Sequence, residues 1–439
     1  MTKNILRLLI LSTIFVGLFS SCSDKKETLK SEDLGYWENQ NHNYQPIDVL
    51  KREIDKKIIK VQQYLTENAL DGILLTQVRN VNWITAGLTN TQIVLNKDVG
   101  AASLLIMKNN EKYLICSGSE VGRLMKESLG DLGYTPKVYN WYEANPIKDV
   151  RDELIKSIAG KGKIGSDVDY PGTILVKDSF KKIRYSLTDE EIDRYRWLGT
   201  QTTEAVSEVC SLVKPGMDEY EIEALTALKL RAKGIIPTVL LTAVDDRIYD
   251  YRHALPGGQV LKNYAMINVV AEKWGMPIAV TRFVHFGEIS QELKSKLEKT
   301  AIINAKYQAA TLPGAKASDI FDSCKKWYAE AGFEGEWQKH HQGGAIGYDD
   351  REWVIYPGIK EVIQNNQAFA WNPTITGAKI EETIIAKENG FEVITKSKAW
   401  PMIIVELNGI EYPQPGILIR DIKSGEIVEQ SDYKISEKE

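Results

Sequence analysis

The second half of this chain repeats one order of elements, and that repeat limits the fold more than any other feature. Thr188 followed by Glu191 is a capping-box pattern that begins a long helical stretch, and Asp218 can cap a second helix running towards Lys233. Strand patterns follow, and then two more helices and further strands. Two helices before strands, twice in succession, predict an α+β domain with an internal duplication. The strands are predicted at 238–242, 265–270, 278–286 and 368–386, and the later helices at 293–310 and 317–331.

An α/β pattern precedes this repeat. Residues 48–65 have helical periodicity, and the apolar run 72–76 is typical of a buried strand. Two further apolar runs, 102–107 and 113–116, flank an Asn-Asn turn and predict a hairpin. Strands then alternate with helices to about residue 185. The predicted domains are therefore 46–185 and 186–400, followed by a strand-like tail, 401–439.

The N-terminus has the pattern of a lipoprotein signal peptide. Lys3 and Arg7 precede an apolar run, 8–19, that is too short to span a bilayer comfortably, and small residues then lead to Cys22. We therefore predict that Cys22 is acylated and that the protein is lipid-anchored in the cell envelope, on the periplasmic or cell-surface side. An ordinary cleaved signal with a chance cysteine is the alternative. The predicted segments are a signal peptide, 1–21, and a polar linker, 22–45.

Charge and cysteine content exclude two other classes of protein. The net charge is −5, and no strongly basic stretch follows the first few residues, so we predict that the chain does not bind nucleic acid. The cysteines beyond the N-terminus are Cys116, Cys210 and Cys324. They are odd in number and widely separated, which fits neither a disulfide framework nor the spacing of a zinc site.

Five short segments carry a family resemblance: Ala69–Thr76, Asn80–Gly87, Lys214–Glu219, Tyr251–Pro256 and Ile380–Thr383. In order and spacing they resemble the pita-bread superfamily, which includes creatinase, prolidase, aminopeptidase P and methionine aminopeptidase. The resemblance covers roughly residues 46–400 and implies a C-terminal pita-bread domain after a smaller creatinase-type α/β domain. It also implies a peptide or small-molecule substrate, and a homodimer, because creatinase-like relatives are commonly dimers.

The metal-binding positions of that family are largely replaced. Active members hold two metal ions with two Asp, one His and two Glu. The matching positions here contain Asn268, Ala279, Gly344 and Asn372, and only Glu381 is retained. An amide lacks the charge that offsets the dehydration of a divalent ion, and Ala and Gly supply no side-chain ligand atom. The sequence therefore predicts a degenerate site that holds no metal and uses no cofactor.

Other polar side chains remain at this site. By resemblance His253 matches a substrate-facing histidine, and His340 matches a second one by its spacing, with His341 beside it as a substitute. An imidazole is a natural proton carrier near neutral pH, so we predict a catalytic pair in which Glu381 orients His253. The residues predicted to bind substrate are His340, His341, Arg351, Trp371, Asn372 and Thr374.

Three functions remain open from the sequence. Creatinase is a metal-free hydrolase on this fold, so the resemblance permits a metal-independent hydrolase or lyase of a small amino-acid-like or peptide-like substrate. A non-catalytic relative that binds a peptide or small ligand would keep the same cleft. A metal-dependent Xaa-Pro peptidase is the third, and the missing carboxylates oppose it. Contact between His253 and Glu381 would favour catalysis, and their separation would favour binding.

Overall fold

The computed structural model describes residues 45–436. The predicted signal peptide, the predicted acylation site Cys22 and the predicted linker as far as residue 44 lie outside the described residues. Within residues 45–436, no helix is both long enough and apolar enough to cross a membrane.

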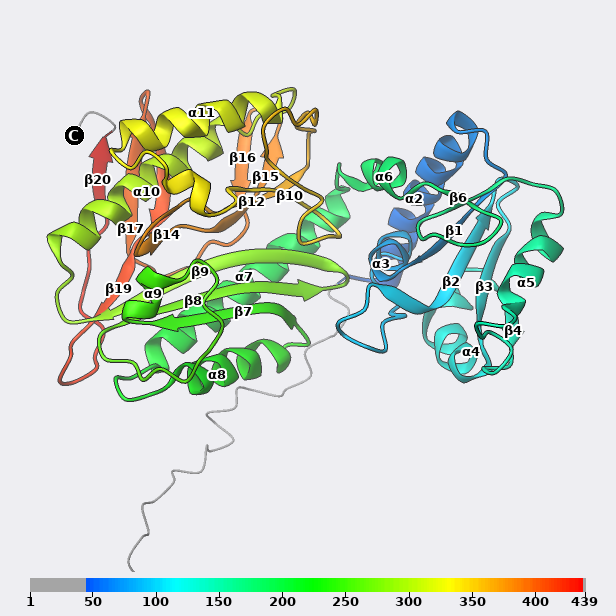
Figure 1. The fold of residues 1–439 in the computed structure, drawn as a ribbon, viewed down its shortest axis with the longest axis horizontal. Helices are drawn as coiled ribbons and strands as arrows, with labels where there is room; N and C mark the ends of the chain where they lie inside the picture. Colours follow the sequence, from blue (N-terminus) through cyan, green and yellow to red (C-terminus); the bar gives the residue numbers. More distant parts are fainter. Residues whose placement is uncertain (1–44, 437–439) are drawn as a thin grey trace, which may run out of the picture. The chain divides into compact units, whose positions relative to one another are not determined.

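The N-terminal domain is built on a six-stranded sheet (Figure 1). Its strands are β1 (Gly72–Gln77), β2 (Val99–Met107), β3 (Lys112–Ser117), β4 (Thr135–Tyr139), β5 (Ile164–Ser166) and β6 (Ile174–Leu175), in the order β4-β3-β2-β1-β5-β6. The central strand β1 is buried along its whole length, antiparallel to β2 and parallel to β5. β2 and β3 form the predicted hairpin, and Asn110 in its turn has a positive φ of 69°, which asparagine adopts more readily than most residues.

Helices of this domain surround the sheet, and the first of them carries a buried charge network. The helices are α2 (Ile47–Glu67), α3 (Val78–Ile84), α4 (Gly118–Leu124) with a π-helical turn at Met125–Leu129, α5 (Val150–Ala159), and α6 (Lys177–Phe180) with a 3-10 turn at Lys181–Arg184. In α2, Lys57 Nζ lies 2.5 Å from Glu53 and 2.7 Å from Glu191. Arg194 approaches Glu53 to 2.6 Å. Burial alone would raise the pKa of Glu53, but Lys57 and Arg194 together lower it to about 2.

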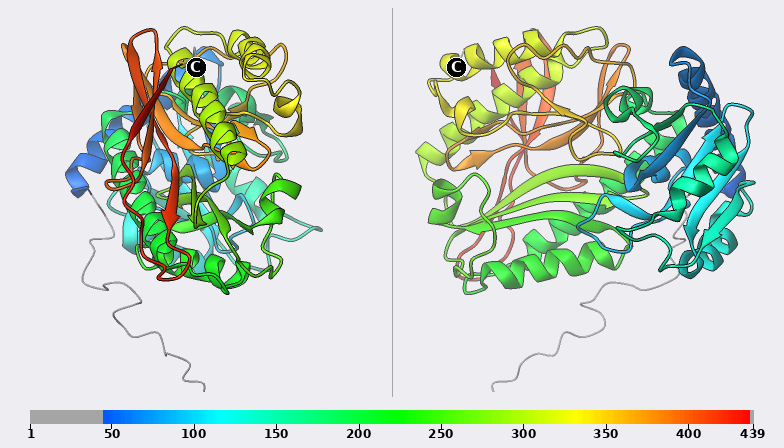
Figure 2. Two further views of the ribbon diagram at one scale, coloured as in Figure 1. Left: turned by 90° about the vertical axis from the view of Figure 1, so that its left-hand side faces the viewer. Right: turned by 45° about the vertical axis from the view of Figure 1, so that its right-hand side comes forward.

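The second domain begins with the predicted helix pair, α7 (Asp189–Leu212) and α8 (Glu219–Arg231). Both helices start at complete capping boxes, in which Thr188 pairs with Glu191 and Asp218 pairs with Glu221. The pair packs on one face of a sheet that contains β7 (Ile236–Val244), β8 (Tyr264–Lys273) and β9 (Met276–Phe286) (Figure 1 and Figure 2). A short helix, α9 (Asp246–Asp250), follows β7.

The same order recurs in the rest of the domain. Two helices, α10 (Gln291–Ala310) and α11 (Ala317–Glu330), precede a 3-10 turn at Glu336–Lys339 and a second sheet, and they lie outside that sheet (Figure 2). This sheet has the order β11-β10-β12-β15-β16 and is antiparallel throughout. Its strands are β10 (Gly343–Ile346), β11 (Trp353–Val354), β12 (Ala368–Trp371), β15 (Glu382–Lys387) and β16 (Gly390–Val393), with a small hairpin of β13 (Thr374–Ile375) and β14 (Ala378–Lys379) inserted after β12. The predicted duplication is confirmed.

The two sheets are joined where β9 meets the start of β15. The backbone N–H of Thr281 donates to the carbonyl oxygen of Glu381 at 3.2 Å. The backbone N–H of Ala279 donates to Thr383 Oγ1 at 2.9 Å, and that hydroxyl donates back to the Ala279 carbonyl at 3.0 Å. These bonds fix the backbone of Glu381 between the sheets.

The residues beyond 400 also belong to sheets. β17 (Met402–Leu407), β18 (Ile410–Pro415) and β20 (Tyr433–Ser436) form a three-stranded sheet. β19 (Ile417–Arg420) instead lies parallel to β9 and becomes the edge strand of the sheet that contains β7, β8 and β9. Arg420 at its end donates to the carbonyl oxygen of Cys210 in α7 at 3.2 Å, so the last strands tie back to the first helix of the domain.

Candidate ligand-binding and active site

A pocket of about 400 Å³ lies between the two sheets of the second domain. Strands β7 and β8 supply its floor, and the segments around residues 253, 341, 351, 372 and 381 supply its polar side chains. It is lined by Val239, Leu241, His253, Leu255, Asn268, Val270, His341, Asp350, Arg351, Asn372, Lys379 and Glu381. The structure therefore brings together six residues singled out from the sequence, although they come from separate parts of the chain: His253, Asn268, His341, Arg351, Asn372 and Glu381.

Glu381 is the centre of the pocket's polar contacts. Its Oε2 accepts hydrogen bonds from Thr281 Oγ1 at 2.9 Å and from the side-chain amide of Asn268. Thr281 and Asn268 face each other across the β8–β9 pair, which places both donors on the same side of the sheet. Lys379 Nζ lies 3.2 Å from Oε2, and the Arg351 guanidinium lies 3.7 Å from Oε1. Burial alone would raise the pKa of Glu381, but Lys379 and Arg351 lower it, so the carboxylate is ionised at neutral pH.

Lys379 is a site residue that the sequence analysis missed. It lies at the end of β14, two residues before Glu381 in extended chain, so the two side chains point to the same face. Its side chain is only 7% exposed. Burial lowers the pKa of Lys379, and the neighbouring carboxylate of Glu381 opposes that shift. The sequence does contain a signal for this contact. Lys379 and Glu381 are two residues apart in a strand pattern, and that spacing predicts that their side chains lie side by side.

Three histidines meet at the rim of the pocket. His253 Nε2 and His340 Nε2 are 2.8 Å apart, and the two rings meet edge to face. His341 stacks loosely against His340 and accepts a 3.2 Å hydrogen bond at Nδ1 from the backbone N–H of Gly343. Burial lowers the pKa of His253, that of His340 to about 3 and that of His341 to about 4. All three imidazoles are therefore neutral at pH 7.

The predicted pairing of His253 with Glu381 is not formed. Both side chains line the same pocket, but the imidazole of His253 contacts His340, and the carboxylate of Glu381 is occupied by Lys379 and its neighbours. The reason is local: a lysine two residues before Glu381 reaches its carboxylate more directly than a histidine on a separate loop can.

Two residues predicted to bind substrate have other roles. Trp371 is 1% exposed, stacks between Tyr307 and Phe369, and donates from Nε1 to Thr311 Oγ1 at 2.9 Å, so it is part of the core. Thr374 lies in the β13–β14 hairpin, where its hydroxyl donates to the Asn372 carbonyl at 3.1 Å. Alternating side chains along a strand point to opposite faces, and Trp371 points away from the pocket that its neighbour Asn372 lines.

Ala279 and Gly344 are also removed from the pocket surface. Ala279 is buried in β9, where its backbone bonds to Thr383. A Cβ atom added to Gly344 would lie 2.1 Å from the carbonyl oxygen of Trp353, so this backbone leaves no room for any side chain at the position. The tight pairing of β10 with β11 thus accompanies the replacement predicted from the sequence.

Three polar atoms in and beside the pocket have no hydrogen-bond partner among residues 45–436. They are Asn372 Oδ1, Arg351 Nε and His340 Nδ1. Buried polar atoms are normally paired, and an unpaired one marks a place where a ligand or water completes the bonding. Asn372 Oδ1 is a hydrogen-bond acceptor and Arg351 Nε is a donor. His340 Nδ1 can be either, depending on the tautomer.

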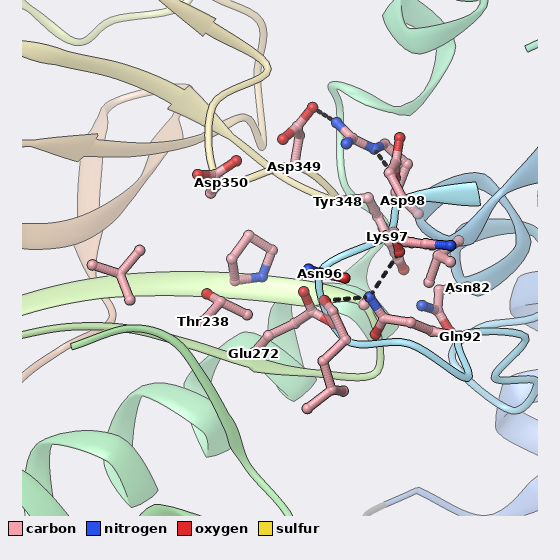
Figure 3. A pocket seen from close by; sticks show the side chains of 16 residues that line it. Asn82, Gln92, Asn96, Lys97, Asp98, Thr238, Glu272, Tyr348, Asp349 and Asp350 are labelled. Carbon is pink, nitrogen blue, oxygen red and sulfur yellow. Dashed lines mark hydrogen bonds and ion pairs between the residues drawn. The ribbon is translucent and has the colours of Figure 1, made fainter. Parts of the chain in front are cut away.

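A second pocket of about 380 Å³ adjoins the first, since Val239 and Asp350 line both. Figure 3 shows Thr238 and Glu272 on neighbouring strands below it, with Asp349 and Asp350 above. Across from them, residues 78–98 of the N-terminal domain complete the lining. Burial raises the pKa of Glu272. The two pockets offer room for a ligand larger than a single amino acid.

Comparison with known proteins gives matches along most of the chain. Residues 57–196 match the family described as "Creatinase/Prolidase N-terminal domain", and residues 193–388 match "Metallopeptidase family M24". An uncharacterized peptidase of Staphylococcus epidermidis is 22% identical over 365 residues, covering 77% of this chain and 99% of that protein. A Xaa-Pro dipeptidase of Pyrococcus horikoshii is 20% identical over 374 residues, covering 79% of this chain and 98% of its own.

Solved structures agree with these matches. The crystal structure of the prolidase from Pyrococcus horikoshii OT3 superimposes with a TM-score of 0.65 at 19% sequence identity, covering 78% of this chain and 99% of that one. The chain therefore belongs to the pita-bread superfamily of creatinase and aminopeptidase P.

Proposed function

We propose that this protein is a metal-independent hydrolase of a small peptide-like or amino-acid-like substrate that carries a carboxylate. The observation that carries the proposal is the contact between Lys379 and Glu381, 3.2 Å apart in a buried position. By the resemblance, Glu381 is the one metal ligand of the family that this chain retains, and the side chain of Lys379 contacts its carboxylate.

The residues present do not fit a pair of divalent ions. Asn268 and Asn372 supply neutral amides, and neither Ala279 nor Gly344 supplies a ligand atom. A divalent ion beside Glu381 would also lie next to the ammonium of Lys379, and like charges at that range inside a protein repel by several kcal/mol. The proposed reaction therefore has no step at such a centre.

Binding of a carboxylate is supported by the buried charges. Lys379 and Arg351 place two positive charges in the pocket, which Glu381 and Asp350 also line, so a substrate carboxylate would be bound by the donor groups of Arg351 and Lys379 and not by a net charge. Arg351 Nε is an unpaired donor, and Asn372 Oδ1 is an unpaired acceptor. A substrate carboxylate would accept a hydrogen bond from Arg351 Nε, and a neighbouring N–H of the substrate would donate one to Asn372 Oδ1. An amino acid or a short peptide carries both groups close together.

Hydrolysis would use the neutral imidazoles. His253 is exposed to the pocket, so its neutral imidazole can take a proton from an attacking water and return it to the leaving amine, while the contact with His340 orients the ring. Arg351 or Lys379 can stabilise the oxyanion that forms on the substrate carbonyl. General acid–base catalysis of this kind typically contributes about 10²–10⁴-fold to the rate.

The second candidate is a binding protein without turnover. It is favoured by the separation of His253 from Glu381, because no carboxylate supports the imidazole of His253 in the way that general bases usually require. In that case Arg351→Ala removes ligand binding, and no variant changes a reaction rate because no reaction occurs.

The test uses the full chain with and without EDTA, screened against dipeptides, including Xaa-Pro dipeptides, and against creatine-like compounds. We expect turnover that EDTA does not reduce, and we expect His253→Ala to lower kcat by about 10²–10⁴-fold while the circular dichroism spectrum is unchanged. His285→Ala is the matched control, because His285 bonds to the Gly287 carbonyl far along β9 from the pocket. Activity that requires added metal, or bound metal that is lost in Glu381→Gln, would contradict the proposal.

We also propose that Cys22 is acylated, so that the protein is held in the cell envelope through a lipid, and that it forms a homodimer. The apolar run followed by Cys22 supports the first proposal. Cys22→Ser is expected to move the protein from the membrane fraction to the soluble fraction of the producing bacterium, while Thr28→Ala leaves it in the membrane fraction. Light scattering of the detergent-extracted chain measures its oligomeric state.

A further inference from the structure

The cluster of His253, His340 and His341 brings together three of the chain's five histidines. One ring nitrogen from each lies within 4.8 Å of the others, and the Nε2 atoms of His253 and His340 are 2.8 Å apart. The three side chains come from two loops, one after α9 and one before β10, and each is at least partly exposed.

We propose that this cluster is a binding site for one transition-metal ion of the Zn²⁺ type, separate from the family's metal position at Glu381. Zn–N bonds of about 2.0–2.1 Å place two nitrogen ligands of a tetrahedral ion about 3.4 Å apart. His253 and His340 need to separate by about 0.6 Å to reach that geometry, a movement that the exposed side chain of His253 on its loop can make. Three imidazoles then leave a fourth position for water or for a carboxylate.

Ligand chemistry sets which ions the cluster selects. Neutral imidazole nitrogen favours Zn²⁺, Ni²⁺, Co²⁺ and Cu²⁺, whereas Mg²⁺, Ca²⁺ and Mn²⁺ prefer oxygen ligands. His340 Nδ1 has no partner among the described residues, so binding an ion at this nitrogen would break no hydrogen bond within the described part of the chain. The Gly343 N–H donates to His341 Nδ1, and a metal bond would have to displace or accommodate this contact. We therefore expect His341 to contribute less than the other two ligands.

The positive charges beside the histidines are expected to weaken the binding of a metal ion there. Lys379 and Arg351 line the same pocket as His253 and His341, and both repel a divalent cation. Replacing Lys379 with Met is therefore expected to strengthen metal binding at the histidines. A site at Glu381 would instead be weakened by Glu381→Gln, which removes its only retained ligand.

The proposed metal site does not depend on the proposed hydrolase function. Inhibition of turnover by the bound ion does depend on it. If His253 is the general base, a bound ion takes up its lone pair and inhibits turnover. Failure of inhibition while binding persists would contradict the role of His253 in hydrolysis and leave the metal site intact. Failure of binding would contradict only the metal site.

The experiment titrates Co²⁺ into the full chain, prepared without a polyhistidine tag, and follows visible absorption. Calorimetry with Zn²⁺ then measures affinity, with Mg²⁺ as the comparison ion. We expect one Zn²⁺ per chain, with binding weakened at least about tenfold by His253→Ala or His340→Ala, unchanged by His285→Ala, and weakened less than about tenfold by Glu381→Gln, which removes only a neighbouring negative charge. The proposal is overturned if the wild-type chain binds no Zn²⁺, or if the His253 and His340 variants bind it as tightly as the wild type does.

Discussion

Replacing Lys379 with Met is expected to lower the free energy of unfolding at pH 7.5 by about 3–5 kcal/mol, measured by urea denaturation. The substitution keeps most of the side-chain volume and removes the ammonium that lies 3.2 Å from Glu381. The carboxylate would then be fully buried with Arg351 as its remaining cation, at 3.7 Å. Removing the nearer cation from a buried carboxylate breaks a buried ion pair, which is among the most destabilising changes that a single substitution can make.

The pH dependence of this loss follows from the pKa of Glu381. In the wild type that pKa is lowered, so the carboxylate contributes stability above its unfolded-state pKa, and this contribution disappears as the pH falls. Without Lys379, the largest of the effects that lower this pKa is lost while burial still raises it, so the penalty is small where the carboxyl is protonated and grows as the pH rises. The difference between variant and wild type is therefore expected to be larger at pH 8 than at pH 4.

A matched control separates this effect from the general loss of a lysine. Lys434→Met removes an exposed ammonium that pairs with Glu411 on the surface, and such pairs contribute little. We expect its midpoint of urea unfolding to match the wild type. Equal stability of Lys379→Met and the wild type would show that the ammonium does not neutralise Glu381.

The second large effect is expected for Glu53→Gln, which removes the carboxylate shared by Lys57 and Arg194. Both cations are essentially inaccessible to solvent, and the substitution leaves Arg194 with no carboxylate at this position. The expected loss is about 3–5 kcal/mol in the free energy of unfolding, read from the urea midpoint. Glu67→Gln on the exposed end of the same helix is the control and is expected to change stability by less than about 0.5 kcal/mol.

Acid titration tests the same network without a substitution. The pKa of Glu53 is lowered to about 2, so its contribution is complete above the unfolded-state value near 4.5 and is lost between about pH 4.5 and pH 2. The wild type is expected to lose stability through that window more steeply than Glu53→Gln does. Parallel stability curves for the two proteins over that range would contradict the low pKa.

Much of the fold could be predicted from local patterns. The capping box at Thr188 and Glu191 marks the first residue of α7, and the Asn-Asn turn marks the β2–β3 hairpin. Both signals lie within a few residues of sequence, where backbone preference decides the outcome. The family resemblance added long-range order, because it placed Asn268, Asn372 and Glu381 around one pocket.

The contacts inside the pocket could not be predicted in the same way. Asn268 faces Thr281 only because of the register between β8 and β9, and both strands are buried on both faces, so alternation gives no sign of which side chains point inward. Trp371 was wrongly predicted to bind substrate for the same reason, because alternation does not show which way a side chain points in a fully buried strand. Lys379 was missed because lysine in a strand usually points to solvent, and its burial depends on a carboxylate that the folded chain brings close.

The position of β19 has a consequence for synthesis of the protein. This strand completes the sheet that carries β7, β8 and β9, yet it is synthesised after all three of them. Until it arrives, β9 presents an unpaired edge, which is a template for pairing with another chain. Premature termination shortly after residue 400 is therefore expected to produce aggregating chains rather than a smaller folded domain.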